Sequence, residues 1–139
     1  MSGPLLPPDF DDLVGQAVRL FWVTRAGGTA TQGGSRGQVI SGKNMDGFLE
    51  VVRAVASHAG LPPSAIHTHG RALLTLPGYY RATKNWDALV IHERRLIAAF
   101  EFKSQVGSLG NNFNNRTEEA AGSASDLGMA FEHRAFEPA

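Results

Sequence analysis

Two acids and a lysine stand at the ends of two apolar runs in residues 85–107. Asp87 precedes the first run, and Glu101 and Lys103 follow the second. The spacing between the two acids accommodates one strand, a tight turn and a return strand, so both carboxylates can reach the same edge of a hairpin. Side chains two residues apart on a strand share a face, which places Glu101 beside Lys103. We therefore expect three charged groups to converge at the end of a hairpin over residues 86–103.

This set of side chains suits the hydrolysis of a phosphodiester. Neighbouring carboxylates repel each other, and Mg²⁺ relieves the repulsion by taking oxygen ligands from one or two acids and the rest from water or phosphate. An adjacent lysine can act on the attacking water or stabilise charge on the phosphate. The alternative is a solvated strand end at which Glu101 and Lys103 pair with neighbours, as charged residues that flank strands commonly do. The triplet alone leaves both interpretations open.

The segment that follows, residues 104–119, is rich in amide side chains. Asn and Gln can make paired hydrogen bonds to adenine and Arg to guanine, and helix N-termini hold phosphates. Asn115 and Glu118 have capping-box spacing, which places Arg116 at a helix start, where an anion is favoured. A polar surface loop rich in Asn and Gly is the alternative. The candidates for DNA contact are Gln105, Asn111, Asn112, Asn114, Asn115 and Arg116.

Two helices are expected before the hairpin because apolar residues recur at helical spacing. The first covers about residues 10–25, with Asp9 as its N-cap. A Gly-, Ser- and Thr-rich stretch at 26–38 has no apolar period and predicts a loop. The second helix covers 43–58, and Gly60 followed by two prolines gives it a firm stop.

From residue 71 the apolar pattern changes to short runs, which predict three strands, two of them joined as a hairpin. A third helix should follow over roughly 116–132. Gly122 and Gly128 each weaken that helix by about 1 kcal/mol relative to alanine, and they would let it lie close against the sheet. The expected strands are 72–76, 88–91 and 96–100.

The composition fits one domain of 139 residues with 42% hydrophobic content. Thirteen basic and thirteen acidic residues cancel, so net charge alone calls for neither nucleic acid nor a membrane surface. The chain has no cysteine, which excludes disulfides and thiolate zinc sites. It shows neither a secretory signal nor an apolar run of the roughly 20 residues that span a bilayer. We expect a cytoplasmic protein without a membrane partner.

Two weaker interpretations remain for other residues. The segment "IHTHG" places two imidazoles on one face, but zinc sites need three or four ligands, so loop histidines are the simpler reading. Aromatic residues next to basic ones could stack on single-stranded nucleic acid, although packing with an exposed polar tip is the more common role. The histidines are His58, His67 and His69, and the aromatics are Tyr79, Tyr80 and Trp86.

The chain resembles the XhoI-type group of type II restriction endonucleases, members of the PD-(D/E)XK nuclease superfamily. The resemblance rests on "NWDALV" and on the long string "AAFEFKSQVGSLGNNFNNRTEEAAGSASDL". It also includes "SGKNMDGFLEVV" and "IHTHGRALLTLPGYYRATKNWD", so it covers most of residues 10–130. The superfamily signature is loose by itself, whereas the long string is highly specific.

The resemblance implies an α/β restriction-endonuclease-like core, a mixed β-sheet flanked by α-helices. It implies Mg²⁺-dependent cutting of both DNA strands at a short palindrome, CTCGAG for this group, leaving 5′-phosphates. Asp87 and Glu101 match the metal-binding acids and Lys103 the lysine of the catalytic triplet. Glu50 lies on a helix where many superfamily members place a further acid. The expected partners are double-stranded DNA, a second copy of the chain, and a cognate DNA methyltransferase without direct contact.

The family chain is longer, and the superfamily core continues after its second main helix with at least one further strand. Beyond Asp126 the close likeness ends. We therefore expect residues 1–139 to be a single domain that lacks the C-terminal part of the family chain. Two alternatives to an active enzyme follow, a non-catalytic DNA-binding remnant and an inactive fragment.

Overall fold

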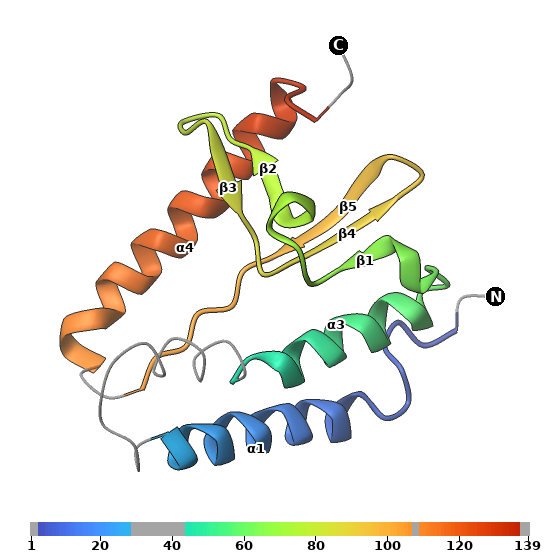
Figure 1. Cartoon of the computed structure of the whole chain (residues 1–139), viewed down its shortest axis with the longest axis vertical. Coiled ribbons are helices and arrows are strands. Elements are labelled where there is room, and N and C mark those ends of the chain that lie inside the picture. The colour runs from blue at the N-terminus through green and yellow to red at the C-terminus, as the bar shows by residue number, and fades with distance from the viewer. Residues whose placement is uncertain (1–2, 29–43, 107–108, 137–139) are drawn as a thin grey trace. The chain divides into compact units, whose positions relative to one another are not determined.

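The computed structural model describes residues 3–28, 44–106 and 109–136. These residues form three α-helices and short β-strands, which confirms the α/β class (Figure 1). They divide into two compact units, Met1–Ile66 and His67–Ala139, which are described separately. One domain over the whole chain stays a prediction.

Helix α1, Phe10–Gly28, begins where the sequence predicts. The Leu13 N–H donates to the Asp9 carbonyl at 3.0 Å, which closes the first helical turn. Acidic residues occupy that turn and Arg25 the last one, the arrangement that the helix dipole favours. Most of the loop expected at 26–38 lies outside the described residues.

Helix α3, Asp46–His58, confirms the second predicted helix, and it buries its apolar face. It ends because Gly60 takes a φ of 84°, a left-handed conformation that glycine adopts at little cost. The Leu61 N–H then donates to the carbonyl of Ala56 at 3.0 Å. The buried residues of α3 are Leu49, Val52 and Ala56.

Gly47 lies at a close approach of α3 to α1. A Cβ atom at this position would lie 2.7 Å from Cα of Ala17, a distance that real Cβ atoms do not show. Ala17 is itself buried. The absence of a side chain on Gly47 therefore lets the two helices of this unit touch through their backbones.

The second unit holds two small sheets rather than the single mixed sheet that we predicted. One has the strand order β1–β4–β5, and the other joins β2 to β3 (Figure 1). The pairings β2–β3 and β4–β5 are antiparallel. The strands are β1 (Ile66–His67), β2 (Thr75–Pro77), β3 (Thr83–Asn85), β4 (Ala88–His92) and β5 (Arg95–Phe100).

The strand predicted at 72–76 is mostly wrong. Arg71–Leu74 is a 3₁₀ helix, η2, and only the short strand β2 follows it. The turn is set by Gly70, whose φ of 84° precedes it, and by the Thr75 hydroxyl, which donates to the Arg71 carbonyl at 2.6 Å. The backbone geometry at Gly70 and Thr75 thus overrides the strand preference of this apolar run.

Strands β4 and β5 confirm the predicted hairpin. Ala88 pairs with Phe100 at the open end and His92 with Arg95 at the closed end. The turn residues between them, 93–94, both have positive φ, as two-residue hairpin turns require. The register shifts between Val90 and Ile91, which marks a bulge near the turn.

Helix α4, Leu109–Glu132, begins well before the predicted position. Asn115 therefore lies inside the helix and is not its N-cap, and Arg116 does not stand at a helix start. Ion pairing of Arg116 with Glu119 at 3.0 Å, three residues apart, supports the helix there. Our expectation that Gly122 and Gly128 allow close packing is also wrong, because a Cβ at either would meet nothing within 4 Å.

A buried carboxylate on α4 holds the turn between β2 and β3. Asp126 is only 1% exposed, and its Oδ1 accepts the N–H groups of Tyr79 and Tyr80 at 3.0 and 2.7 Å. Its Oδ2 lies 3.5 Å from Nε of Arg81. These bonds tie the small β2–β3 sheet to the helix and compensate the burial of the charge.

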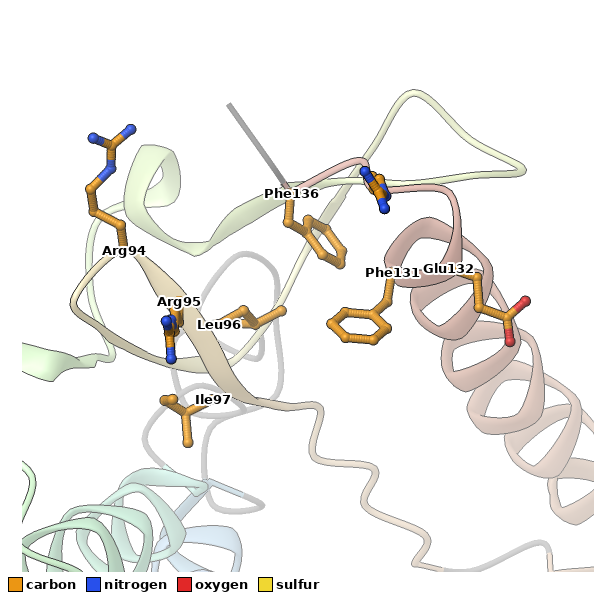
Figure 2. A pocket seen from close by; sticks show the side chains of 8 residues that line it. Arg94, Arg95, Leu96, Ile97, Phe131, Glu132 and Phe136 are labelled. Atoms are coloured by element: carbon orange, nitrogen blue, oxygen red, sulfur yellow. The ribbon is translucent and has the colours of Figure 1, made fainter. Parts of the chain in front are cut away.

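An apolar groove of about 510 Å³ lies between β5 and the C-terminal end of α4. Figure 2 shows Phe131 and Phe136 facing Leu96 across it. Phe131 is 70% exposed. The groove is at the closed end of the hairpin, away from Asp87 and Glu101.

None of the described helices has the length and apolar character needed to cross a lipid bilayer.

Candidate functional site

The open end of the β4–β5 hairpin brings the two predicted acids to one edge. The N–H of Asp87 donates to the Phe100 carbonyl at 2.9 Å, which continues the strand pairing by one residue. The Asp87 carboxylate then accepts the N–H of Phe102 through Oδ2 at 2.6 Å. Asp87 is thereby anchored to the residue that follows Glu101. This geometry confirms the expected placement of both acids at the same end of the hairpin.

Glu101 and Lys103 form an ion pair, with Nζ of Lys103 at 3.0 Å from Oε1 of Glu101. This contact confirms that the two side chains share a face. A second ammonium group, that of Lys84 on β3, lies 2.7 Å from the same oxygen. Lys103 also lies 3.4 Å from Oε2 of Glu119 on α4. The site is therefore a network of two lysines and two glutamates with Asp87 beside it.

The network keeps Glu101 ionised. Burial opposes its charge, but hydrogen bonds from Lys84, Lys103 and Ser123, together with the charge of Lys103, lower the pKa of Glu101 from 4.5 to about 2. Ser123 lies on α4, one helical turn after Glu119, so the helix presents both side chains to the hairpin end. Glu101 is thus a carboxylate across the neutral pH range.

The same contacts keep Lys103 protonated. Burial acts against its charge, yet hydrogen bonds and charge from Glu101 and then Glu119 raise the pKa of Lys103 above its usual value. The hydrogen bond from Lys103 in turn lowers the pKa of Glu119. In this arrangement Lys103 is a proton donor and a positive charge, and it is not prepared to accept a proton from water.

Lys84 is the residue that sequence reasoning missed. It is one of the basic residues next to Tyr79, Tyr80 and Trp86, for which the sequence suggested stacking on nucleic acid. Trp86 is in fact buried, and Nζ of Lys84 lies 4.9 Å from the centre of its ring. The available signal was the two-residue spacing of Lys84 and Trp86, which puts both on one face of an extended segment. Nothing local to Lys84 points to Glu101, which is 17 residues away.

The amide-rich segment is helical rather than a loop over residues 109–119. At 100° per residue, Asn112, Asn115 and Arg116 share the face of α4 that carries Glu119. Asn114 falls on the opposite face. All four residues are exposed, and Arg116 pairs with Glu119. Gln105 precedes the helix, and the side chain of Asn111 lies outside the described residues. Contact of any of them with DNA stays a prediction.

Glu50 lies on α3 in the other compact unit and forms an ion pair with Arg53 one turn away. Its role as an auxiliary metal ligand stays a prediction.

The alternative metal site finds no support. Among the described residues, no group of three or more His, Cys, Asp or Glu side chains could hold a metal ion. His58 instead donates from Nε2 to the Pro4 carbonyl at 2.8 Å, and Nδ1 of His69 lies 2.8 Å from the Thr68 hydroxyl. Tyr79 and Tyr80 remain exposed, and the ring of Tyr79 stacks on His133.

The donor chemistry of Asp87 and Glu101 fits Mg²⁺. Mg²⁺ is commonly held by one or two carboxylates, with water and phosphate oxygens filling the remaining positions. A ligand must be deprotonated to bind, and the low pKa of Glu101 meets this condition. Oε1 of Glu101 already contacts two ammonium groups, and Ser123 donates a further hydrogen bond to the carboxylate.

Comparison with known proteins identifies close relatives. Residues 24–139 match the family described as "Restriction endonuclease XhoI". The chain is 48% identical to the type II restriction enzyme XhoI of Xanthomonas vasicola over 128 residues. This match covers 88% of the chain and 52% of that enzyme. It is 50% identical to the type II restriction enzyme AbrI of Azospirillum brasilense over 137 residues. That match covers 92% of the chain and 60% of the enzyme.

A third relative is the type II restriction enzyme BstVI of Geobacillus stearothermophilus, 47% identical over 109 residues, or 74% of this chain and 48% of the relative. No solved structure matches the chain. The chain spans about half the length of the curated relatives it matches. Because the family match extends over most of the sequence, from residue 24 to residue 139, the chain belongs to the XhoI restriction endonuclease family.

Proposed function

We propose that this chain carries the catalytic site of a type II restriction endonuclease that makes Mg²⁺-dependent double-strand cuts at a short palindrome, CTCGAG, and leaves 5′-phosphates. The observation that carries the proposal is the ion pair of Glu101 and Lys103 beside Asp87 at the open end of one hairpin. The names and the 47–50% identities of the relatives support the same activity. We further propose that the chain forms a single domain with a restriction-endonuclease-like core.

In this proposal Asp87 and Glu101 would hold Mg²⁺, and Glu50 stays a candidate ligand on the family resemblance alone. When bound, Mg²⁺ neutralises charge on the phosphate and makes water a better nucleophile. Lys103 donates a hydrogen bond to a non-bridging phosphate oxygen, because its raised pKa keeps it protonated. The Phe102 N–H fixes the Asp87 carboxylate in place before substrate arrives.

The DNA would meet the face of α4 that adjoins this network. Asn112, Asn115 and Arg116 lie on that face, so a duplex whose phosphate reaches Lys103 would also pass them. We propose that these three make the principal contacts, with Gln105, Asn111 and Asn114 in supporting ones. Amide and guanidinium groups suit both base edges and phosphates.

The biological setting follows from the activity. A palindrome has two symmetric half-sites, so we propose that two copies of the chain bind one duplex. A cognate DNA methyltransferase would protect the host sites without touching the nuclease, and both would act in the cytoplasm.

Incubation of the purified chain with a CTCGAG duplex and Mg²⁺ tests the activity. We expect cleavage that depends on Mg²⁺, that fails on a duplex with one base pair of the site exchanged, and that falls by at least about 100-fold in Lys103→Ala, as loss of one transition-state contact predicts. Arg95→Ala removes one positive charge at the far end of the same hairpin and should leave the rate unchanged. Cleavage by Lys103→Ala at the wild-type rate would refute the assignment of this site.

A second candidate is a chain that binds DNA without cutting it, for which the exposed amide and guanidinium side chains on α4 would suffice. It predicts a Mg²⁺-independent gel shift on the CTCGAG duplex without cleavage. An inactive fragment predicts neither shift nor cleavage and a broad, non-cooperative thermal transition.

A further inference from the structure

Lys84 occupies a fixed position beside Glu101. Its side chain is 11% exposed, its Nζ lies 2.7 Å from Oε1 of Glu101, and the Trp86 ring lies 4.9 Å from the ammonium group. The buried ring and the carboxylate both favour the charge, so the ammonium has two stabilising neighbours. Its strand is held as well, because Thr75 and Asn85 pair across β2–β3 and Oγ1 of Thr75 lies 2.5 Å from Oδ1 of Asn85.

Lys103 contacts the same oxygen from a more open position. Its side chain is 28% exposed, and Oε2 of Glu119 offers it a second carboxylate at 3.4 Å. Glu119 is anchored in turn by Arg116. One lysine is therefore confined to Glu101, and the other has an alternative partner and access to solvent.

Lys84 and Lys103 both neutralise the charge of Glu101. A partly buried carboxylate needs a cationic partner, since burial of an unpaired charge is costly. Lys84, Lys103 and Ser123 all donate hydrogen bonds to Glu101, and departure of Lys103 towards a phosphate would remove one of the two cationic donors. With Lys84 in place, Oε1 stays bonded when Lys103 moves.

We propose that Lys84 is a positioning residue that holds Glu101 through Oε1 and so releases Lys103 for the substrate phosphate. This inference rests on the proposed function, because it assigns Lys103 to a phosphate. It adds a residue from β3 to Asp87, Glu101 and Lys103, the motif residues at the open end of the β4–β5 hairpin.

Nitrogen-15 NMR of the lysine ammonium groups tests the fixed position without any cleavage. The chain has three lysines, so Lys84→Arg and Lys103→Arg assign the signals by loss. We expect an ammonium signal from Lys84 that exchanges slowly with water and that is lost in Glu101→Gln. On titration with Mg²⁺ the Lys103 signal should shift, and the Lys84 signal should stay within its linewidth. A Lys84 signal that shifts as far as that of Lys103 overturns the inference.

DNA binding, measured by fluorescence anisotropy with Ca²⁺ in place of Mg²⁺, tests the release of Lys103. Lys84→Met keeps the apolar stem and should weaken binding by about tenfold, the value of one charge-assisted hydrogen bond. In a Lys103→Ala background the same change should have little further effect, because no Lys103 remains to be released. Lys84→Arg should restore binding, since guanidinium can pair with the carboxylate and stack on Trp86.

Additive losses in the double variant would make Lys84 a direct phosphate contact and overturn the positioning role. If Lys84→Met lost no more DNA affinity than Arg95→Ala, the effect would be one of net charge, and the positioning role of Lys84 would be overturned too. Thermal midpoints check that each variant is folded. If the unmodified chain binds no CTCGAG duplex, the proposed function fails, and the ammonium spectra still decide whether Lys84 holds Glu101.

Discussion

Glu101 is ionised through its contacts with Lys84, Lys103 and Ser123, so acid must break these contacts when it protonates the carboxylate. The residue also shows what side-chain spacing can predict. Strand alternation and hairpin length place Glu101 beside Lys103 and at the same edge as Asp87, because both rules act over a few residues. Lys84 could not be predicted in this way, since it reaches Glu101 from the neighbouring small sheet.

The acid response of the fold gives a prediction for Glu101. Its pKa is lowered from 4.5 to about 2, so the unfolded chain takes up the proton at higher pH than the folded chain. The resulting stabilisation is complete above about pH 5 and is lost as the pH falls towards 2. Glu101→Gln should therefore be less stable than the unmodified chain at neutral pH, and the gap between their thermal midpoints should narrow in acid.

Glu118→Gln is the matched control, because it removes the same charge from an exposed position on α4. Its midpoint should differ little from that of the unmodified chain and by the same amount at each pH. A gap for Glu101→Gln that stays constant from neutral pH to about pH 2 would contradict the stabilisation described here.

At the scale of elements, the apolar pattern predicts α1, α3, β4 and β5 well. Helix α3 and strand β4 bury a continuous face, whereas β5 has no fully buried residue. The start of α4 was not predictable from the same signal. Its asparagines favour caps and turns, and the ion pairs of Glu119 with Arg116 and with Lys103 lie one to two turns further along the helix. The side of α4 that faces the strands buries the polar residues Ser123 and Asp126, whereas a helix usually buries apolar residues on its inner side.

Two glycine substitutions test how the turn between β2 and β3 is held on α4. A Cβ at Gly78 would lie 2.6 Å from both Cγ and O of Arg81 and 2.7 Å from Oδ2 of Asp126. Gly78→Ala should therefore disturb the Asp126 bonds and lower the free energy of unfolding by about 1–3 kcal/mol. Gly122→Ala meets nothing within 4 Å and should raise it by about 0.5–1 kcal/mol through helix propensity. Urea unfolding curves of the two variants measure both effects, and equal signs would refute the account of the turn.

At the scale of the whole molecule, the chain spans about half the length of the curated relatives it matches, and the candidate site lies in its second unit. The candidate site residues of the second unit come from a stretch of 40 residues, from Lys84 on β3 to Ser123 on α4. The sequence alone brought Asp87, Glu101 and Lys103 together, and it missed Lys84, Glu119 and Ser123. Local sequence patterns do not predict how the two compact units are arranged, or how two copies would pair in the proposed homodimer.

The proposed homodimer predicts a stoichiometry. Sedimentation of the chain with a CTCGAG duplex in Ca²⁺ should show one duplex bound by two chains of 14.9 kDa each. A duplex that carries only one half of the palindrome should bind more weakly, because it can engage one copy at a time. A complex of one chain per duplex at saturation would exclude the symmetric arrangement.

The bulge at Val90 and Ile91 has a consequence for how this protein can vary. It lies between the turn at residues 93–94 and the acids at the open end, and it already absorbs one residue of mismatch between the strands. Changes of length at the turn can be taken up there before they reach Asp87 and Glu101. The turn is therefore the natural place to insert an affinity tag or a fluorophore, and the part of the hairpin where natural sequences can drift without moving the two acids apart.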